Sequence, residues 1–239
     1  MYQDNFYKKT ESNSYFLRWK QDEKLYNYSK NYLRPSKEEI LNTISSHYKL
    51  KNKTILEIGC FIGYLIKELK KNHNCDVHGI EPSSLATNFA NKYFKLNIEN
   101  STLLKSKYFN LKKNTFSKFD VIICDDVLSW IDRNAIMPSL GVIDWLLKPD
   151  GIIFIRDFSH PTNFAYKNHH WKKKNIYNFK QKLGHKMNFL SSGKYIELFN
   201  NTRITSQYQK IKMKNNMGLI WSDSILKKVV DFTHPIIEF

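Results

Sequence analysis

The sequence is poor in cysteine and contains no long apolar run, and both shortages exclude classes of protein. Its three cysteines, Cys60, Cys75 and Cys124, are odd in number and follow no paired spacing, so neither a disulfide framework nor a CxxC zinc site is expected. No run approaches the roughly 18–20 apolar residues that cross a bilayer. The first residues also lack the apolar stretch of a secretory signal. We therefore expect a reduced, cytoplasmic protein without a membrane span.

The sequence has enough apolar residues for a full core. Of its 239 residues, 41% are hydrophobic and 15% are aromatic. A chain of this length and composition can fold as one domain with extensions, and it needs no disulfide or metal to hold it together.

Arginine is also scarce, although the chain is strongly basic. The formal net charge is +16, yet it comes from 33 lysines and only five arginines. Such a charge suggests a polyanionic partner, whereas readers of phosphates and bases tend to favour arginine. A lysine surplus is equally explained by a biased genome. Composition bias should act on the whole chain, however, and residues 167–214 hold twelve basic residues against one acid, which keeps an anionic substrate open.

Short apolar segments alternate with amphipathic segments between residues 53 and 157. The apolar segments have the length and continuity of buried parallel strands, and the amphipathic ones have apolar residues at helical spacing. We expect strands over 53–58, 75–81, 94–98, 119–125 and 151–156, and helices over 64–72, 85–93 and 140–147. This order predicts an α/β fold with a Rossmann-like, doubly wound, mostly parallel sheet and helices on both faces.

The two ends of the chain have different patterns. Residues 1–50 predict an N-terminal helical cap, with a break between two helices at Pro35-Ser36, and residues 51–239 form the main domain. Within that domain, residues 159–193 are basic and rich in loop residues, and we expect them to form an insertion or lid on the substrate side. Residues 203–231 alternate as antiparallel strands around a turn near 215–218.

The most informative motif runs from Ile55 to Gly63. Its glycines, Gly59 and Gly63, directly follow the first expected strand, where a turn lets a ligand approach the backbone and the start of the next helix. Glu81 ends the second strand, eighteen positions after Gly63. That position suits a carboxylate that accepts from the two ribose hydroxyls of an adenosine.

These segments together resemble the class I S-adenosylmethionine-dependent methyltransferases. Glu57, Gly59 and Gly63 match the family's acid-x-Gly-x-Gly-x-Gly loop, and Glu81 matches its ribose acid. Residues 79–83, Gly-Ile-Glu-Pro-Ser, look like the version in sugar and small-molecule methyltransferases. Residues 119–130 are similar to the fourth-strand motif, and 146–155 to the turn that enters the fifth strand.

The resemblance implies a cofactor, S-adenosylmethionine, with S-adenosylhomocysteine as the product. It implies that the cofactor is bound by Glu57, Gly59, Cys60, Phe61, Gly63, Glu81, Pro82 and Asp125. Phe61 departs from the pattern, because the family has glycine there, so its backbone must take an ordinary φ or tolerate strain. Two positions keep alternatives: Glu57 could pair with a charge, and Asp125 could be a helix N-cap.

Methyl transfer to oxygen or nitrogen needs a positioned acceptor and, for some acceptors, a base that removes a proton. We take His169, His170 and Asp157 as candidate bases, because they follow the fifth strand, where such enzymes often hold substrate. The alternatives are solvated histidines and a salt bridge from Asp157 to Arg156 or a lysine. No metal is expected, because His160, His169 and His170 lack a ligand spacing.

Three functions are compatible with these residues. The first is methyl transfer to an oxygen or nitrogen of a small molecule, in particular a sugar or a nucleotide-linked or phosphorylated glycan precursor, whose phosphates the basic segment would bind. The second is methylation of RNA, on ribose or base, through residues 167–214, although the fourth-strand motif is not the one associated with base amino groups. The third is a non-catalytic binding module that keeps the cofactor fold. The oligomeric state is open.

Overall fold

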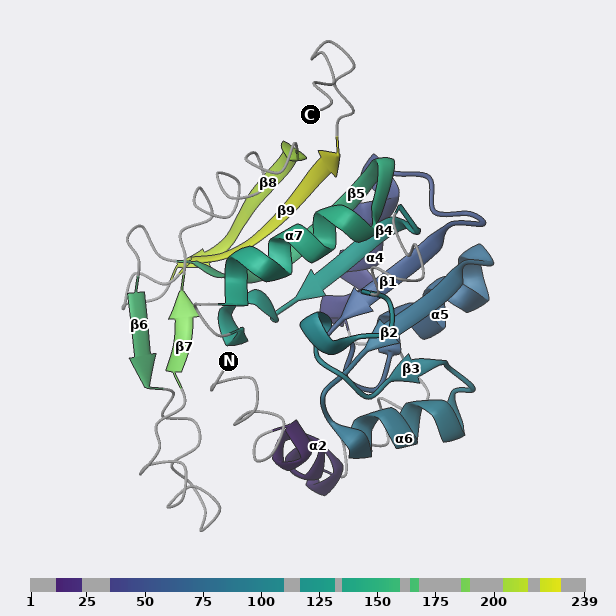
Figure 1. Cartoon of the computed structure of the whole chain (residues 1–239), viewed down its shortest axis with the longest axis vertical. Coiled ribbons are helices and arrows are strands. Elements are labelled where there is room, and N and C mark those ends of the chain that lie inside the picture. Colours follow the sequence, from purple (N-terminus) through teal and green to yellow (C-terminus); the bar gives the residue numbers. More distant parts are fainter. Residues whose placement is uncertain are drawn as a thin grey trace, which may run out of the picture.

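A single mixed sheet organises the chain (Figure 1). The computed structural model describes residues 12–22, 35–109, 117–131, 135–159, 164–167, 186–189, 204–214 and 220–228. Within these residues the order of the seven strands is β3-β2-β1-β4-β5-β9-β8. Their bounds are β1 (Thr54–Ile58), β2 (Asp76–Ile80), β3 (Ile98–Glu99), β4 (Phe119–Asp125), β5 (Leu147–Ser159), β8 (Ile204–Lys214) and β9 (Ile220–Lys228).

The first five strands of the sheet, β3 to β5, pair in parallel, and β5-β9 and β9-β8 pair antiparallel. The strand order reverses between β1 and β4, so the loops after these two strands leave in opposite directions. Ligands bind at such a point in open α/β sheets. The expected Rossmann-like, doubly wound fold with C-terminal antiparallel strands is therefore confirmed.

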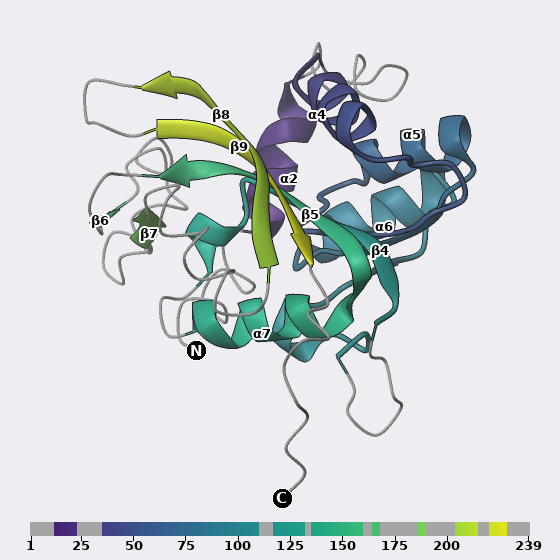
Figure 2. The ribbon, with the colours of Figure 1, turned by 90° about the horizontal axis from the view of Figure 1, so that it is seen from above.

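Helices cover both faces of the sheet (Figure 2). On one face lie α2 (Ser12–Gln21), α4 (Pro35–His47), α5 (Tyr64–His73) and α6 (Ser84–Tyr93), and on the other lies α7 (Ile136–Leu146). Alternate strand residues enter the two cores, because side chains of a strand point to opposite faces. Ile55 packs in the α4–α5 core, whereas Leu56 and Ile58 pack in the α7 core.

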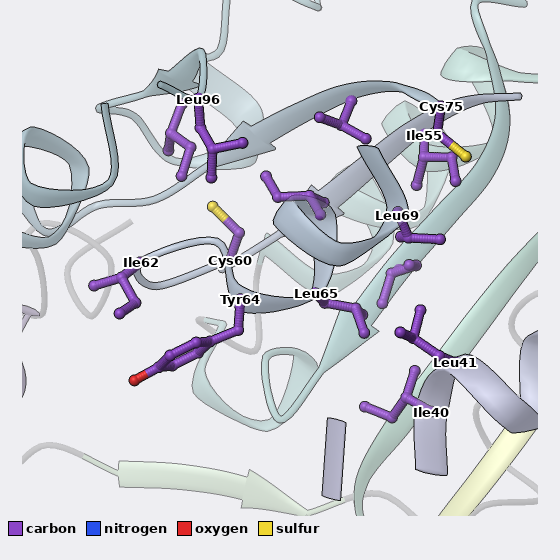
Figure 3. Close-up of a cluster of buried hydrophobic side chains, with 14 of the residues drawn as sticks. Ile40, Leu41, Ile55, Cys60, Ile62, Tyr64, Leu65, Leu69, Cys75 and Leu96 are labelled. Atoms are coloured by element: carbon purple, nitrogen blue, oxygen red, sulfur yellow. The ribbon is translucent and has the colours of Figure 1, made fainter. Parts of the chain in front are cut away.

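The core on the α4–α5 face holds the helix that begins at the glycine loop (Figure 3). Ile40 and Leu41 of α4 lie toward Leu65 and Leu69 of α5, and all four are buried. Burying an aliphatic side chain of this kind contributes about 1.5–3 kcal/mol. This packing fixes the start of α5, and thus the glycine loop, against the end of β1.

Both N-terminal helices contact the main domain. The second helix begins at Pro35, as expected. The first, α2, is fixed by Asn13: its Oδ1 accepts from the Ser83 hydroxyl at 2.9 Å and from the Leu85 N–H at 3.2 Å. Ser83 itself caps α6, because its Oγ accepts from the Ala86 N–H. Helix α2 is therefore held at the N-terminus of α6, directly after Glu81.

Three expectations about strands need correction. Strand β3 begins at Ile98 and not at 94. Strand β5 begins at Leu147, where a helix was expected to end; Leu147 pairs with Phe119, and the register shifts before Val121 pairs with Ile152. The Lys-Pro-Asp-Gly segment is thus an irregularity inside the pairing.

The segment expected to be loop-rich contains two short strands, β6 (Phe164–Lys167) and β7 (Lys186–Phe189), which pair antiparallel. The C-terminal hairpin agrees with expectation in its strands, since Lys214 pairs with Ile220. Its turn lies outside the described residues. Within the described part of the chain, no helix combines the length and hydropathy of a membrane span.

Candidate functional site

The loop after β1 turns sharply back on itself. Gly59 and Gly63 have φ of 67° and 73°, in the left-handed region that favours glycine. The Gly59 N–H donates to the Ile80 carbonyl at 2.8 Å, and the Gly63 N–H donates to the Cys60 carbonyl at 2.8 Å. A Cβ on Gly63 would lie 2.5 Å from Leu96 Cδ1. A Cβ on Gly59 would lie 2.5 Å from Val127 Cγ2, so both glycines are required by conformation and by close packing.

Of the two backbone conformations expected for Phe61, an ordinary φ or a strained one, the structure has the strained one. Its φ is 53°, so a phenylalanine adopts the left-handed conformation that the family's glycine would adopt freely; this costs roughly 1–2 kcal/mol. Its ring packs against α2, with centroids 4.9 Å from Tyr15 and 5.4 Å from Trp19. Phenylalanine in place of glycine thus strains the backbone, but its ring makes aromatic contacts that hold α2 over the loop.

Glu81 is fixed by the loop that it faces. Its Oε2 accepts from the Phe61 N–H at 2.9 Å, and its Oε1 accepts from the Ser83 N–H at 2.7 Å. Burial raises the pKa of Glu81 to about 7, and the two N–H donors oppose that rise. The side chain is preorganised, because both its oxygens are held before any ligand arrives. Pro82 follows directly, and its carbonyl accepts from the Asn100 side chain.

Glu57, at the end of β1, has one unsatisfied oxygen. Its side chain is 1% exposed, and its Oε2 has no hydrogen-bond partner among the described residues. Its Oε1 lies 3.7 Å from Lys37 Nζ. Burial raises the pKa of Glu57 to about 7, which Lys37 opposes and Asp125 and Glu81 reinforce. Glu57 thus pairs with a charge and has one oxygen without a partner among the described residues, and its binding of the cofactor stays a prediction.

Further carboxylates gather at the carboxyl ends of β4 and β5. Asp125 accepts a hydrogen bond from Lys37. The residue at the N-cap of η4 (Leu128–Trp130) is Val127, so the N-cap alternative for Asp125 is wrong. Burial raises the pKa of Asp126 well above its usual range, reinforced by Asp157 and Asp125. The rim of the site is consequently rich in carboxyl groups, which raise one another's pKa values.

Arg156 has a different partner from the one considered from the sequence. Its Nε and Nη2 donate to the two carboxylate oxygens of Asp223 on β9, at 2.6 and 2.7 Å. Its Nη1 donates to the Ser36 carbonyl at 2.7 Å, and Glu39 lies 3.3 Å from Nη2. This buried guanidinium therefore joins β5, β9 and the first turn of α4, and its carboxylate partners are Asp223 and Glu39 in place of the expected Asp157.

The three cysteines are buried and free. Burial raises the pKa of the Cys60 and Cys124 thiols, so neither has the character of a nucleophile. Cys60 lies in the cofactor loop, and its Sγ would be 2.6 Å from a Cβ on Gly79. Its role there is packing between β1 and β2.

The candidate bases divide into two groups. Asp157 is buried on β5 near Asp126, at the same edge of the sheet as the other carboxylates. His169 and His170 lie outside the described residues, as do His160 and most of the expected lid. Among the described residues, no group of three His, Cys, Asp or Glu side chains could hold a metal ion.

Sequence reasoning missed Lys37 and Asp223 as parts of this edge. The sequence held one weak sign of the role of Lys37. The residue lies in the first turn of a helix, where the helix dipole disfavours a cation, so its presence there points to a partner elsewhere in the fold. Asp223 had only the signal of an acid inside an otherwise apolar strand pattern.

The residues fit the expected cofactor. The left-handed loop brings backbone close to a ligand, Glu81 presents a held carboxylate for two hydroxyls, and the open Oε2 of Glu57 can accept from an ammonium group. When bound, S-adenosylmethionine supplies an electrophilic methyl group on a sulfonium. This fold and this site define a class I S-adenosylmethionine-dependent methyltransferase, and not a bare scaffold.

Comparison with known proteins agrees. A family model described as "Methyltransferase domain" matches residues 49–218, and the chain belongs to that family. A protein of Rickettsia prowazekii (strain Madrid E), uncharacterized protein RP028, is 29% identical over 108 residues. That match covers 44% of this chain and 43% of the relative, so it reaches less than half of the relative's length.

Two solved structures share the fold at low identity. The 1,6-didemethyltoxoflavin-N1-methyltransferase of Burkholderia thailandensis, solved with 1,6-didemethyltoxoflavin and S-adenosylhomocysteine, is 14% identical, with a TM-score of 0.63 over 91% of this chain and 87% of that one. The geranyl diphosphate C-methyltransferase of Streptomyces coelicolor A3(2), solved with Mg²⁺, geranyl diphosphate and S-adenosylhomocysteine, is 10% identical, with a TM-score of 0.58 over 80% and 79%. At such identities the likeness shows the fold alone.

Proposed function

We propose that the protein transfers the methyl group of S-adenosylmethionine to an oxygen or nitrogen atom of a small molecule. The observation that carries the proposal is Glu81, held by the backbone N–H groups of Phe61 and Ser83 beside the loop that follows β1, where the strand order reverses. The two solved neighbours act on small molecules by their names, a toxoflavin precursor and geranyl diphosphate. A small-molecule acceptor is consistent with both.

Calorimetric titration with S-adenosylmethionine and S-adenosylhomocysteine tests the cofactor assignment. Glu81→Ala should weaken binding by about 1–3 kcal/mol, because hydrogen bonds to a charged group are lost. Glu68→Ala is the matched control: this acid of α5 pairs with Lys67 and Asn72, away from the site. Wild-type protein that binds neither compound, or Glu81→Ala protein with unchanged affinity, would contradict the assignment.

For the acceptor, we propose a sugar or a nucleotide-linked or phosphorylated glycan precursor. The support is the likeness of residues 79–83 to sugar methyltransferases and the +11 charge of residues 167–214. Part of that likeness has a local cause, because Gly79 is required by its contact with Cys60 and Ser83 caps α6. A screen of sugar nucleotides against uncharged sugars and simple amines, with methyl transfer followed by mass spectrometry, would separate these classes.

Proton removal from the acceptor is assigned to one of three candidates, Asp157, His169 and His170. Asp157 has the support of its burial beside the other carboxylates of the site. Single substitutions Asp157→Asn, His169→Ala and His170→Ala, each measured for cofactor affinity and for rate, identify the base. The base is the residue whose loss lowers the rate and leaves cofactor affinity unchanged; three unaffected rates would exclude all three.

RNA is the second candidate acceptor, favoured by the clustering of twelve basic residues in 167–214. The described edge of the site holds four carboxyl groups, of Glu57, Asp125, Asp126 and Asp157, and in their ionised form these complement a cationic cofactor better than a phosphate chain. RNA binding that falls steeply with salt, and methylated RNA as a product, would favour this candidate. Indifference to RNA would remove it.

We also propose the following organisation. Residues 1–50 form a cap on the domain 51–239, and residues 159–193 act as a lid over the acceptor. The contacts of α2 with Phe61 and of α4 with Asp125 support the cap. The three free cysteines support a cytoplasmic location.

A further inference from the structure

Lys37 is the one cationic side chain, among the described residues, with recorded contacts to the carboxylates at the ends of β1 and β4. Its Nζ donates to Asp125 Oδ2 and lies 3.7 Å from Glu57 Oε1. It comes from α4, outside the strand–loop–helix units that form the rest of the site. The contact with Asp125 spans 88 positions of the chain.

Helix stability does not explain this lysine. A cation in the first turn of a helix opposes the helix dipole, and Lys37 lies in the first turn of α4. The buried Arg156 fixes that turn from below through the Ser36 carbonyl, and Arg156 is itself held by Asp223. The hydrogen bond from the buried Arg156 therefore holds the first turn of α4, and with it Lys37, at the edge of the sheet.

The groups around Lys37 are almost all acidic. Burial alone would lower the pKa of Lys37, but Asp125 and Glu57, with a contribution from Tyr15 of α2, hold it above its usual value. Glu57 also faces Glu81 of β2, and Asp125 lies beside Asp126, which Asp157 of β5 repels in turn. Without Lys37, Glu57 and Asp125 would lose the cation that contacts both of them and offsets the repulsion among these carboxylates.

We propose that Lys37 is a positioning residue of the cofactor site, which pairs with the Glu57 and Asp125 carboxylates, orients both, and favours the ionised form of Glu57 for the cationic methionine end of the cofactor. The inference rests on the proposed cofactor site. It adds that α4 contributes to that site, and that Lys37 acts through two acids and not by contact with the transferred methyl group.

The ionisation of Glu57 should make cofactor affinity depend on pH, and this dependence can be measured. The Glu57 pKa of about 7 is already raised by burial, and Lys37, followed by the backbone N–H of Ile66, opposes the rise. Binding of a cation favours the ionised carboxylate, so affinity should increase as the pH rises through the pKa of Glu57 in the free protein, and then level off. Removal of Lys37 should move that rise to higher pH.

The experiment is calorimetric titration of the full-length protein with S-adenosylmethionine between pH 6 and 9, for wild type, Lys37→Met and Lys37→Arg. Lys37→Met should bind about fivefold more weakly than wild type at pH 7, because a rise of about one unit in the pKa of Glu57 lowers its ionised fraction at that pH from about one half to about one tenth. At pH 9 it should bind within about threefold of wild type, or more tightly, because the Glu57 carboxylate is then ionised without help. Lys37→Arg should restore the wild-type profile.

Lys53→Met is the matched control. Lys53 also lies near an acid of β4, with Nζ 3.5 Å from Asp120, but at the opposite, amino ends of β1 and β4. Its removal should leave the affinity–pH profile unchanged. Lys37→Gln is measured in parallel, since it lacks the charge but can still donate to Asp125, and it keeps the test available if the methionine variant does not fold.

The outcomes separate this inference from the proposed function. Failure of the wild-type protein to bind the cofactor would overturn both. A wild type that binds, together with Lys37 variants whose profile is unchanged or is lowered equally at every pH, would overturn the role of Lys37 alone. A profile that moves to higher pH in Lys37→Met and Lys37→Gln, and returns in Lys37→Arg, supports it.

Discussion

The buried pair of Arg156 and Asp223 should be the most sensitive charged contact of the fold. Both side chains are almost fully buried, at 3% and 0% exposed, and two hydrogen bonds of 2.6 and 2.7 Å join them. Asp223→Asn removes the negative charge and leaves the guanidinium, among the described residues, with the half-exposed Glu39 as its one charged partner. Breaking one side of such a pair costs about 3–5 kcal/mol, because a buried charge loses its partner.

Thermal unfolding followed by circular dichroism measures this cost. For a chain of this size, 3–5 kcal/mol lowers the unfolding midpoint by roughly 6–20 °C. Asp150→Asn is the control: Asp150 pairs with Lys227 across the same two strands at 2.9 Å, but it is 78% exposed. An exposed pair contributes about 0–1 kcal/mol, and asparagine also tolerates the left-handed φ of Asp150.

Removing both members of the buried pair gives a second check. Arg156→Met with Asp223→Leu leaves no buried charge, so the double variant should regain part of the stability lost by Asp223→Asn. If Asp223→Asn and Asp150→Asn lower the midpoint equally, burial does not set the strength of these pairs, and the reasoning is refuted.

Three further predictions concern the cofactor loop and its acids. The cofactor-free protein should lose stability as the pH rises from about 5 to 8: burial raises the pKa of Glu57 and Glu81 to about 7, so the folded state keeps protons that the unfolded state has released. Glu81→Gln should flatten the midpoint–pH curve, and an unchanged slope would count against this account. Gly63→Ala should lower the free energy of unfolding in urea by about 1–3 kcal/mol, because its Cβ would meet Leu96 at a φ of 73°. Phe61→Gly should relieve strain but lose the ring contacts with α2, for a net loss of about 1–3 kcal/mol; a more stable variant would show that the ring contributes little.

The sequence predicted the cofactor side of the site well, for local reasons. Strand β4 has the predicted bounds, and Gly59, Gly63 and Glu81 lie where the spacing placed them. These features depend on short apolar runs and on turns of a few residues, which are readable from neighbouring positions.

The features that the sequence did not predict depend on distant residues. Lys37 reaches Asp125 across 88 positions, and Arg156 reaches Asp223 across 67. No local pattern states which acid a cation will meet. The start of β5 was missed for another reason: Pro149, Asp150 and Gly151 are strong turn residues, yet pairing of Leu147 with Phe119 extends the strand past them.

The residues that helix α2 packs against also constrain the order in which the chain can fold during synthesis. Helix α2 leaves the ribosome early, but the ring of Phe61 and the N-terminus of α6 that receive it come some 40–70 residues later. The ion pair that supports the first turn of α4 forms later still, because Arg156 is neutralised only when Asp223 arrives. At roughly 5–20 residues per second that delay is on the order of 10–40 s. Helix α4 can therefore pack against α5 early, through Ile40 and Leu41, whereas the contacts of its first turn are complete only when the last strands of the sheet have been made.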